Sequence, residues 1–191
     1  MFLLTSVALA VGIIKLYKHN TLVQDLYSLE MLARVDTICF DKTGTITDGQ
    51  MHVKELIKID QSFELDQNKI ISSILGNLTD TNQTAIAMHN HFGQEVFFSA
   101  SYTLPFNSER KFSAVTFKEI GTFAFGAPEF VLKQKNVEVD KLVKQYAQKG
   151  FRVILLVKCD GKLDGDKLSQ HRKPVAIIVI EDHIREDAAA T

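Results

Sequence analysis

The sequence predicts an α/β protein in which an incomplete Rossmann-like domain carries an inserted α+β domain with an antiparallel sheet. Two observations support this prediction. The compact apolar segment VDTICF (35–40) is followed by Asp41, and KPVAIIVIED (173–182) ends in Asp182. We expect both segments to be parallel strands, which in open α/β sheets commonly present ligand-binding residues at such ends. Between the two segments, helical spacing of apolar residues gives way to short alternating stretches that are typical of antiparallel strands. This order indicates one domain nested within another.

The composition limits the classes of function. The chain has 191 residues, of which 46% are hydrophobic and 24% are charged, so it can bury a sizeable core. Its net charge of -1 provides no basic surface for nucleic acid, which we do not expect as a partner. The two cysteines, Cys39 and Cys159, both lie in apolar segments. This placement is typical of reduced thiols rather than of a disulfide framework.

The first 14 residues, MFLLTSVALAVGII, carry no charge. A helix needs about 20 residues to cross a bilayer, and the segment lacks the basic start and cleavage site of a signal peptide. Lys15 and Lys18 follow it, as expected on the cytoplasmic side of a membrane. We therefore expect residues 1–14 to be the end of a transmembrane helix whose beginning is missing. The protein would then lie in the cell membrane, with the residues from about 15 onward in the cytoplasm. A buried helix is the alternative.

Periodicity places the remaining elements. Apolar residues recur at helical spacing in four segments, 22–34, 67–79, 82–92 and 139–149. Antiparallel strands are expected in VFFSASYTLPF, KFSAVTFK and GTFAFGA, and further strands in RVILLVKC and KPVAIIVIED. The expected domains are the end of a membrane helix (1–14), a stalk with the first part of the Rossmann-like domain (15–50), the inserted domain (51–172) and a return strand (173–191).

The segment DKTGTIT (41–47) has the chemistry of a phosphoryl acceptor. The Asp41 carboxylate can act as a nucleophile, while Gly44 lets the loop backbone approach the phosphate oxygens. Lys42 adds a positive charge, and Mg²⁺ would be needed to neutralise the transferring group. Phosphatases with an aspartate nucleophile carry a second acid two residues later, but Thr43 stands there. We therefore expect an aspartyl phosphate that hydrolyses slowly.

DKTGTIT resembles the phosphorylation motif of P-type cation-transporting ATPases, which belong to the haloacid dehalogenase superfamily. LVQDLYSLEMLARVD (22–36) is similar to the stalk of bacterial members. The resemblance implies that ATP transfers its γ-phosphate to Asp41, that Lys42 and Thr43 assist, and that Asp41 and Thr43 hold Mg²⁺. It also implies coupling to transport of a cation through membrane helices that this chain does not contain, so we expect the chain alone not to pump.

The same resemblance assigns a nucleotide pocket to the inserted domain. LPFNSERKFSAV (104–115) is similar to the family's adenine-binding strand pair and gives Phe106 for stacking and Lys111 for the pocket wall. DTNQTAIAM (80–88) resembles its helix start, with Gln83 where many members have glutamate. GTFAFGAPE (121–129) resembles its KGAPE motif, in which Gly126 is kept and Phe125 replaces the lysine.

Two further segments complete the expected site. GFRVILLV (150–157) is similar to the family segment whose arginine, here Arg152, approaches the nucleotide phosphates. IEDHIRED (180–187) resembles a D-x-x-R motif and gives Asp182 for the ribose or hinge and Arg185 for a phosphate contact.

Two alternative functions remain open. The chain could be a non-pumping nucleotide-binding module derived from a truncated pump. It could also be a haloacid-dehalogenase-type phosphatase, although Thr43 and the large inserted domain both argue against this function.

Overall fold

The computed structural model describes residues 2–163 and 165–188. The chain divides into two compact units, one ending at Asp41 and the other beginning at Lys42. Each unit is described separately below.

The first unit contains two helices. Helix α1 spans Phe2–Lys18 and has both of its basic residues in the last turn. Helix α2 spans Leu26–Leu32 and begins at Asp25, whose carboxylate accepts a hydrogen bond from the Tyr27 N–H. Among the described residues, none of the helices combines the length and hydropathy that a membrane crossing requires.

The prediction of a strand at residues 35–40 is wrong. These residues form no strand and are all exposed, and Ile38 is 69% accessible to solvent. A β-strand needs a neighbour to accept and donate its backbone hydrogen bonds, and the described part of the first unit contains no other strand. Asp41 therefore follows a segment without regular secondary structure and not the end of a sheet strand.

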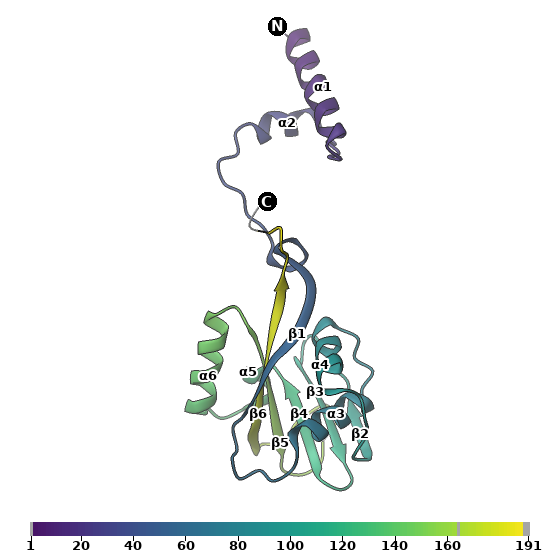
Figure 1. Cartoon of the computed structure of the whole chain (residues 1–191), viewed down its shortest axis with the longest axis vertical. Coiled ribbons are helices and arrows are strands. Elements are labelled where there is room, and N and C mark those ends of the chain that lie inside the picture. The colour runs from purple at the N-terminus through teal and green to yellow at the C-terminus, as the bar shows by residue number, and fades with distance from the viewer. Residues whose placement is uncertain (1, 164, 189–191) are drawn as a thin grey trace. The chain divides into compact units, whose positions relative to one another are not determined.

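The second unit is built on a six-stranded sheet in the order β1-β6-β5-β4-β3-β2, in which every neighbouring pair is antiparallel (Figure 1). The strands span Thr47–Lys58 (β1), Ala100–Leu104 (β2), Phe112–Phe117 (β3), Gly121–Gly126 (β4), Arg152–Cys159 (β5) and Arg172–Ile184 (β6). A short π-type turn, η1, spans Lys42–Ile46 and leads into β1.

The strands predicted within 95–127 and at RVILLVKC are confirmed as β2 to β5. The parallel character expected of KPVAIIVIED is wrong, because β6 pairs antiparallel with both β1 and β5. Its long apolar run reflects burial on both faces of the sheet rather than parallel pairing. The expected domain boundaries at 50/51 and 172/173 fall within β1 and β6, so the sheet is continuous across both positions.

Side chains of the central strands alternate between two hydrophobic layers. On β5, Ile154 and Leu156 pack into the cluster that contains residues of α3 (Gln67–Asn77) and α4 (Gln83–Phe92). Leu155 and Val157 point into the opposite cluster, which contains residues of α5 (Pro128–Val131) and α6 (Val137–Gln148). Because successive side chains of a strand point to opposite faces, helices cover both faces of the sheet. Figure 1 shows α6 across the sheet from α3 and α4.

The helices expected at 67–79, 82–92 and 139–149 are confirmed as α3, α4 and α6, with shifts of one or two residues at their ends. Asp66 begins α3 by accepting a hydrogen bond from the Asn68 N–H, and Asn82 begins α4 by accepting one from the Ala85 N–H. The cap at Asn82 fixes where the first turn of α4 begins.

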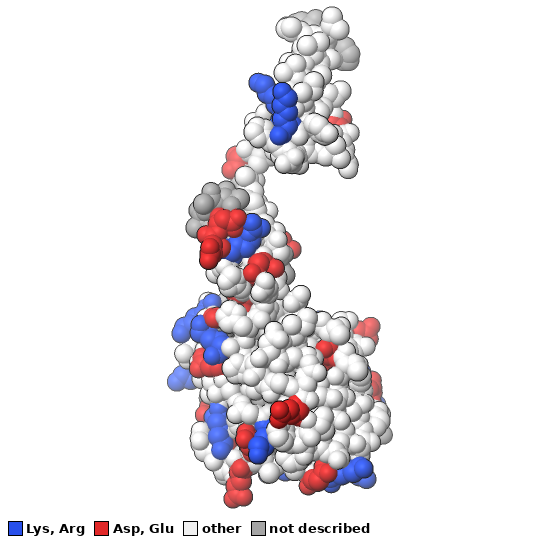
Figure 2. Space-filling model, turned by 45° about the vertical axis from the view of Figure 1, so that its right-hand side comes forward, with Lys and Arg blue, Asp and Glu red and all other residues white. Residues whose placement is uncertain are grey.

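Charged residues of both signs are scattered over the face of the second unit that Figure 2 shows, and uncharged residues cover much of it. This distribution agrees with a net charge of -1 for the chain.

Candidate functional site

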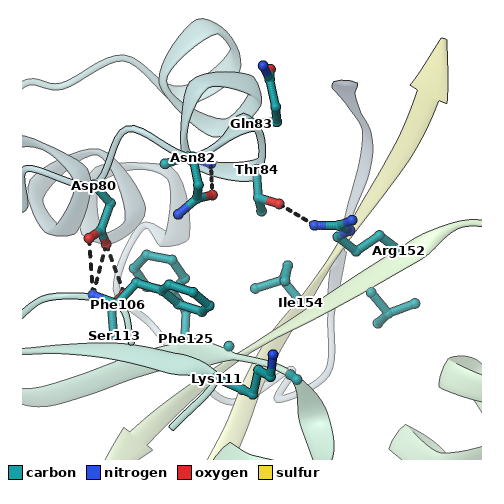
Figure 3. A pocket seen from close by; sticks show the side chains of 14 residues that line it. Asp80, Asn82, Gln83, Thr84, Phe106, Lys111, Ser113, Phe125, Arg152 and Ile154 are labelled. Atoms are coloured by element: carbon teal, nitrogen blue, oxygen red, sulfur yellow. Dashed lines mark hydrogen bonds between the residues drawn. The ribbon is translucent and has the colours of Figure 1, made fainter. Parts of the chain in front are cut away.

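A cavity of about 380 Å³ lies in the second unit where the start of α4 faces the strands β3, β4 and β5 (Figure 3). Its walls come from the loop into α4 and the first turn of α4, the loop between β2 and β3, the start of β3, the end of β4 with the residue after it, and the start of β5. The lining residues are Asp80, Asn82, Gln83, Thr84, Ala85, Phe106, Lys111, Ser113, Phe125, Gly126, Ala127, Arg152, Val153 and Ile154.

The structure brings five of the residues predicted from sequence into this one cavity. They are Gln83, Phe106, Lys111, Gly126 and Arg152. These residues span about 70 positions of sequence. The antiparallel pairing of β3, β4 and β5 brings the strands that carry Gly126 and Arg152 next to the loop that ends at Lys111.

Phe106 lies in the loop between β2 and β3, and 42% of its surface is exposed. Its backbone N–H donates to the Asp80 carboxylate, with the nitrogen 3.0 Å from Oδ1 and 3.3 Å from Oδ2. The ring belongs to neither of the two hydrophobic clusters. It therefore offers an aromatic surface to a ligand without first having to leave a packed core.

Lys111 ends the same loop in a left-handed backbone conformation, with φ of 58°. Its N–H donates to the Asn107 carbonyl at 2.7 Å, and its own carbonyl accepts the Ala127 N–H at 3.0 Å. The Gly126 backbone lies against this carbonyl, where a Cβ at position 126 would be 2.4 Å from the Lys111 oxygen. Only glycine fits this contact, so Gly126 is needed to bring the wall of the cavity together.

Arg152, the first residue of β5, lines the cavity. Its Nη1 donates to the Thr84 Oγ1 at 2.7 Å, which links β5 to the first turn of α4 (Figure 3). Arg152 and Lys111 give the cavity two positive charges, and Asp80 gives it one negative charge. Gln83 is exposed, and in Figure 3 its side chain extends away from Lys111.

Sequence reasoning did not assign roles to several lining residues, above all Asp80, Thr84 and Ser113. Asp80 precedes the Asn82 cap of α4, where a carboxylate would ordinarily be interpreted as part of a helix start. Its hydrogen bonds go instead to the loop between β2 and β3 and to β3 itself. Because its partners Phe106 and Ser113 lie 26 and 33 residues away, no local sequence pattern indicated this role of Asp80.

Two of the residues predicted to contact the nucleotide, Asp182 and Arg185, do not line the cavity. Asp182 on β6 forms an ion pair with Lys42, and the Lys42 Nζ also lies 3.5 Å from the Gly150 carbonyl oxygen. Arg185 donates to both carboxylate oxygens of Asp187, at 2.9 and 2.8 Å, and these bonds raise the pKa of its guanidinium. The structure thus joins Lys42 to Asp182 but does not bring Asp182 or Arg185 to the cavity.

The predicted Mg²⁺ ligands are Asp41 and Thr43. Asp41 is the last residue of the first unit, and the side chain of Thr43 is outside what the structure describes. Within residues 2–163 and 165–188, no group of three or more His, Cys, Asp or Glu side chains is arranged to hold a metal ion. The metal site therefore stays a prediction.

Comparisons with known proteins show which proteins this chain resembles. A scan against protein-family models finds no match. The chain is 37% identical to the probable cation-transporting ATPase exp7 of Streptococcus pneumoniae over 198 aligned residues, which cover 99% of this chain and 24% of that protein. It is 32% identical to the calcium-transporting ATPase CtpE of Mycolicibacterium smegmatis, with 100% of this chain and 24% of the relative covered.

The fold also matches solved structures. A crystal structure of a zinc-transporting PIB-type ATPase superposes with a TM-score of 0.56 at 19% identity, and the match covers 97% of this chain and 28% of that one. This likeness confirms the predicted α/β fold with an antiparallel sheet. The chain spans about a quarter of the length of the curated relatives described above. Over that span, the chain is similar to cation-transporting ATPases, and its fold matches a PIB-type member.

Proposed function

We propose that the second unit binds ATP in the cavity, and that in the whole protein the γ-phosphate of ATP passes to Asp41 to drive cation transport across the cell membrane. The observation that carries the proposal is that five residues assigned to ATP from sequence motifs line one cavity of about 380 Å³. That volume lies in the range of small-molecule sites.

The cavity offers separate features for the two ends of a nucleotide. The half-exposed ring of Phe106 can stack on adenine, because flat aromatic surfaces attract bases through π contacts. Lys111 and Arg152 supply positive charge for the phosphates, and Arg152 is oriented by its bond to Thr84. Gly126 lies close to the Lys111 carbonyl and has no side chain, so it does not fill the cavity that it lines.

The proposed chemistry at Asp41 is phosphoryl transfer. A carboxylate oxygen of Asp41 attacks the γ-phosphorus, the bond from that phosphorus to the β,γ-bridging oxygen breaks, and ADP leaves. Mg²⁺ held by Asp41 and Thr43 would neutralise the phosphate charge, and oxygen ligands of this kind suit that ion. Because Thr43 cannot serve as a general base, water attacks the aspartyl phosphate slowly. A persistent intermediate is what coupling to transport requires.

ATP binding is tested by calorimetric titration of the whole chain. Base–aromatic stacking is worth about 1–3 kcal/mol, so Phe106→Ala should weaken ATP binding by about fivefold to 150-fold. Lys111→Ala should also weaken it. The matched controls are Phe130→Ala, since Phe130 is also 42% exposed, and Lys144→Ala on α6. An ATP affinity that Phe106→Ala leaves unchanged contradicts the proposed pocket.

Transfer to Asp41 is tested with γ-labelled ATP in the longer pump that the resemblance implies. The protein should acquire a label that hydroxylamine removes, as expected of an acyl phosphate, and Asp41→Asn should abolish it. Labelling that persists in Asp41→Asn contradicts the assignment of the nucleophile. Fast hydrolysis of simple phosphate esters by the chain would favour the phosphatase alternative instead.

A further inference from the structure

We infer that Asp80 is a positioning residue, which holds the aromatic ring of Phe106 ready for adenine without touching the nucleotide. This inference deepens the proposed ATP site and rests on it. It is carried by the contacts between the Asp80 carboxylate and two other parts of the chain.

The Asp80 carboxylate connects three elements of the second unit. Asp80 lies between α3 and α4, and its Oδ1 accepts the Phe106 N–H at 3.0 Å. Its Oδ2 accepts the Ser113 hydroxyl at 3.0 Å and also lies 3.3 Å from the Phe106 nitrogen (Figure 3). Ser113 is only 1% exposed and pairs with Phe125 in the middle of the sheet. The carboxylate therefore ties the Phe106 loop to a rigid strand.

Phe106 needs such a tether because packing does not hold it. Its side chain is 42% exposed and belongs to neither hydrophobic cluster. The preceding residue, Pro105, has no backbone N–H to donate, which leaves the Phe106 N–H as the first donor of the loop. A ring fixed before the ligand arrives binds more tightly, because less conformational entropy is lost on binding.

The Asp80 carboxylate is better suited to holding the Phe106 loop than to contacting the nucleotide directly. Both Phe106 and Ser113 present donors, and an ionised carboxylate only accepts, so it can serve both at once. A direct contact with ATP phosphates would set like charges against each other. Positioning is therefore the role that both the geometry and the charge favour.

The test is a double-mutant cycle measured by calorimetric titration of the whole chain with ATP and with AMP. Asp80→Ala should weaken both ligands by about the same factor, between roughly threefold and tenfold, since hydrogen bonds to a charged group are lost. In a Phe106→Ala background, Asp80→Ala should have no further effect, because the ring it positions is gone.

Two further variants separate positioning from other roles. Asp80→Asn can still accept the Phe106 N–H through its oxygen and donate to Ser113 through its amide, so it should restore affinity to within about threefold of the wild type. Asp60→Ala is the matched control, because Asp60 likewise accepts a backbone N–H and a hydroxyl, both from Ser62, at 2.9 and 2.6 Å, and does not line the cavity. It should leave ATP affinity unchanged.

The outcomes distinguish this inference from the proposed function. If Phe106→Ala itself leaves ATP and AMP binding unchanged, the proposed nucleotide site fails. If Phe106→Ala weakens binding but Asp80→Ala does not, or if the two effects simply add, the positioning role is overturned. Asp80→Asn behaving like Asp80→Ala would also overturn it, by showing that the charge itself acts. Should Asp80→Ala prevent folding, Asp80→Ser, whose side chain is too short to reach both partners, takes its place in the cycle.

Discussion

The Gly126 backbone lies against the Lys111 carbonyl so closely that no side chain fits between them. A Cβ at position 126 would lie 2.4 Å from the Lys111 oxygen and 2.5 Å from the Phe112 Cβ. Gly126 and Phe112 are also paired across β3 and β4, so the two strands cannot separate without breaking the sheet. This close contact therefore fixes the positions of two residues that line the cavity, Gly126 and Lys111.

Gly126→Ala should destabilise the chain by about 1–3 kcal/mol, because an added methyl group meets backbone that cannot move away. It should also weaken ATP binding, since Lys111 would have to shift. Chemical denaturation and titration with ATP measure the two effects. Gly121→Ala is the control: its φ of +87° makes alanine unfavourable, but nothing lies within 4 Å of an added Cβ. It should lower stability and leave ATP affinity unchanged.

Thr84→Val should weaken ATP binding about three- to tenfold, because Arg152 loses the hydroxyl that accepts from its Nη1. Valine keeps the shape of threonine, and the Arg152 side chain remains near the surface. Unfolding free energy should therefore change by no more than about 0.5 kcal/mol. Titration and denaturation of the same protein sample give both values.

Thr103→Val on the exposed edge strand β2 is the matched substitution for Thr84→Val and should change neither quantity. If Thr84→Val leaves ATP affinity at the wild-type value, the bond to Thr84 does not orient Arg152 for the nucleotide.

Glu181 should make stability depend on acidic pH. The Lys54 ammonium and the His52 ring both bond to its carboxylate, at 2.5 and 2.8 Å, and hold the pKa of Glu181 below its ordinary value of 4.5. A depressed pKa in the folded state contributes stability above the ordinary value, and this contribution is lost as pH falls through the folded pKa. Thermal unfolding of wild type and Glu181→Gln should differ most near neutral pH and converge as the pH drops well below 4.5.

The difference should be modest, since surface ion pairs contribute about 0–1 kcal/mol. Glu129→Gln, which removes an exposed acid from α5, controls for the loss of one negative charge. A constant difference between wild type and Glu181→Gln across the whole acidic range would show that the hydrogen bonds do not depend on ionisation of Glu181.

The two cysteines should differ sharply in reactivity. Cys159 is buried, and burial raises the pKa of its thiol to about 11, whereas Cys39 is exposed. At about pH 8, a thiol reagent should therefore modify Cys39 in the folded chain and reach Cys159 only after unfolding. The raised pKa also means that Cys159 favours folding less as pH rises from its ordinary value of 9.0 toward about 11.

Cys39→Ser is the control and should abolish labelling of the folded chain by the thiol reagent. Rapid labelling of folded Cys39→Ser would show that Cys159 is accessible from β5 and would contradict its place in the second hydrophobic cluster.

Local patterns predicted most of the second unit. Strands β2 to β5 alternate clearly or carry short apolar runs, and α3, α4 and α6 show helical spacing. Strand β1 was missed, because its sequence TDGQMHVKELIK mixes charged residues into an edge strand with one partner. The strand expected at 35–40 did not form for a different reason: among the described residues, this mostly apolar segment pairs with no other strand.

The sequence by itself determined the residue types of the proposed site: an aspartate followed by a lysine and small hydroxyl residues, and the aromatic and basic residues of the proposed nucleotide pocket. Each of these motifs is local, because the residues within one motif lie a few positions apart in the chain. Only the tertiary structure decided that β6 runs antiparallel between β1 and β5, that Gly126 closes on Lys111, and that Asp80 holds the Phe106 loop. These features depend on backbone pairing and hydrogen bonds between distant segments, which the sequence of any one segment does not encode.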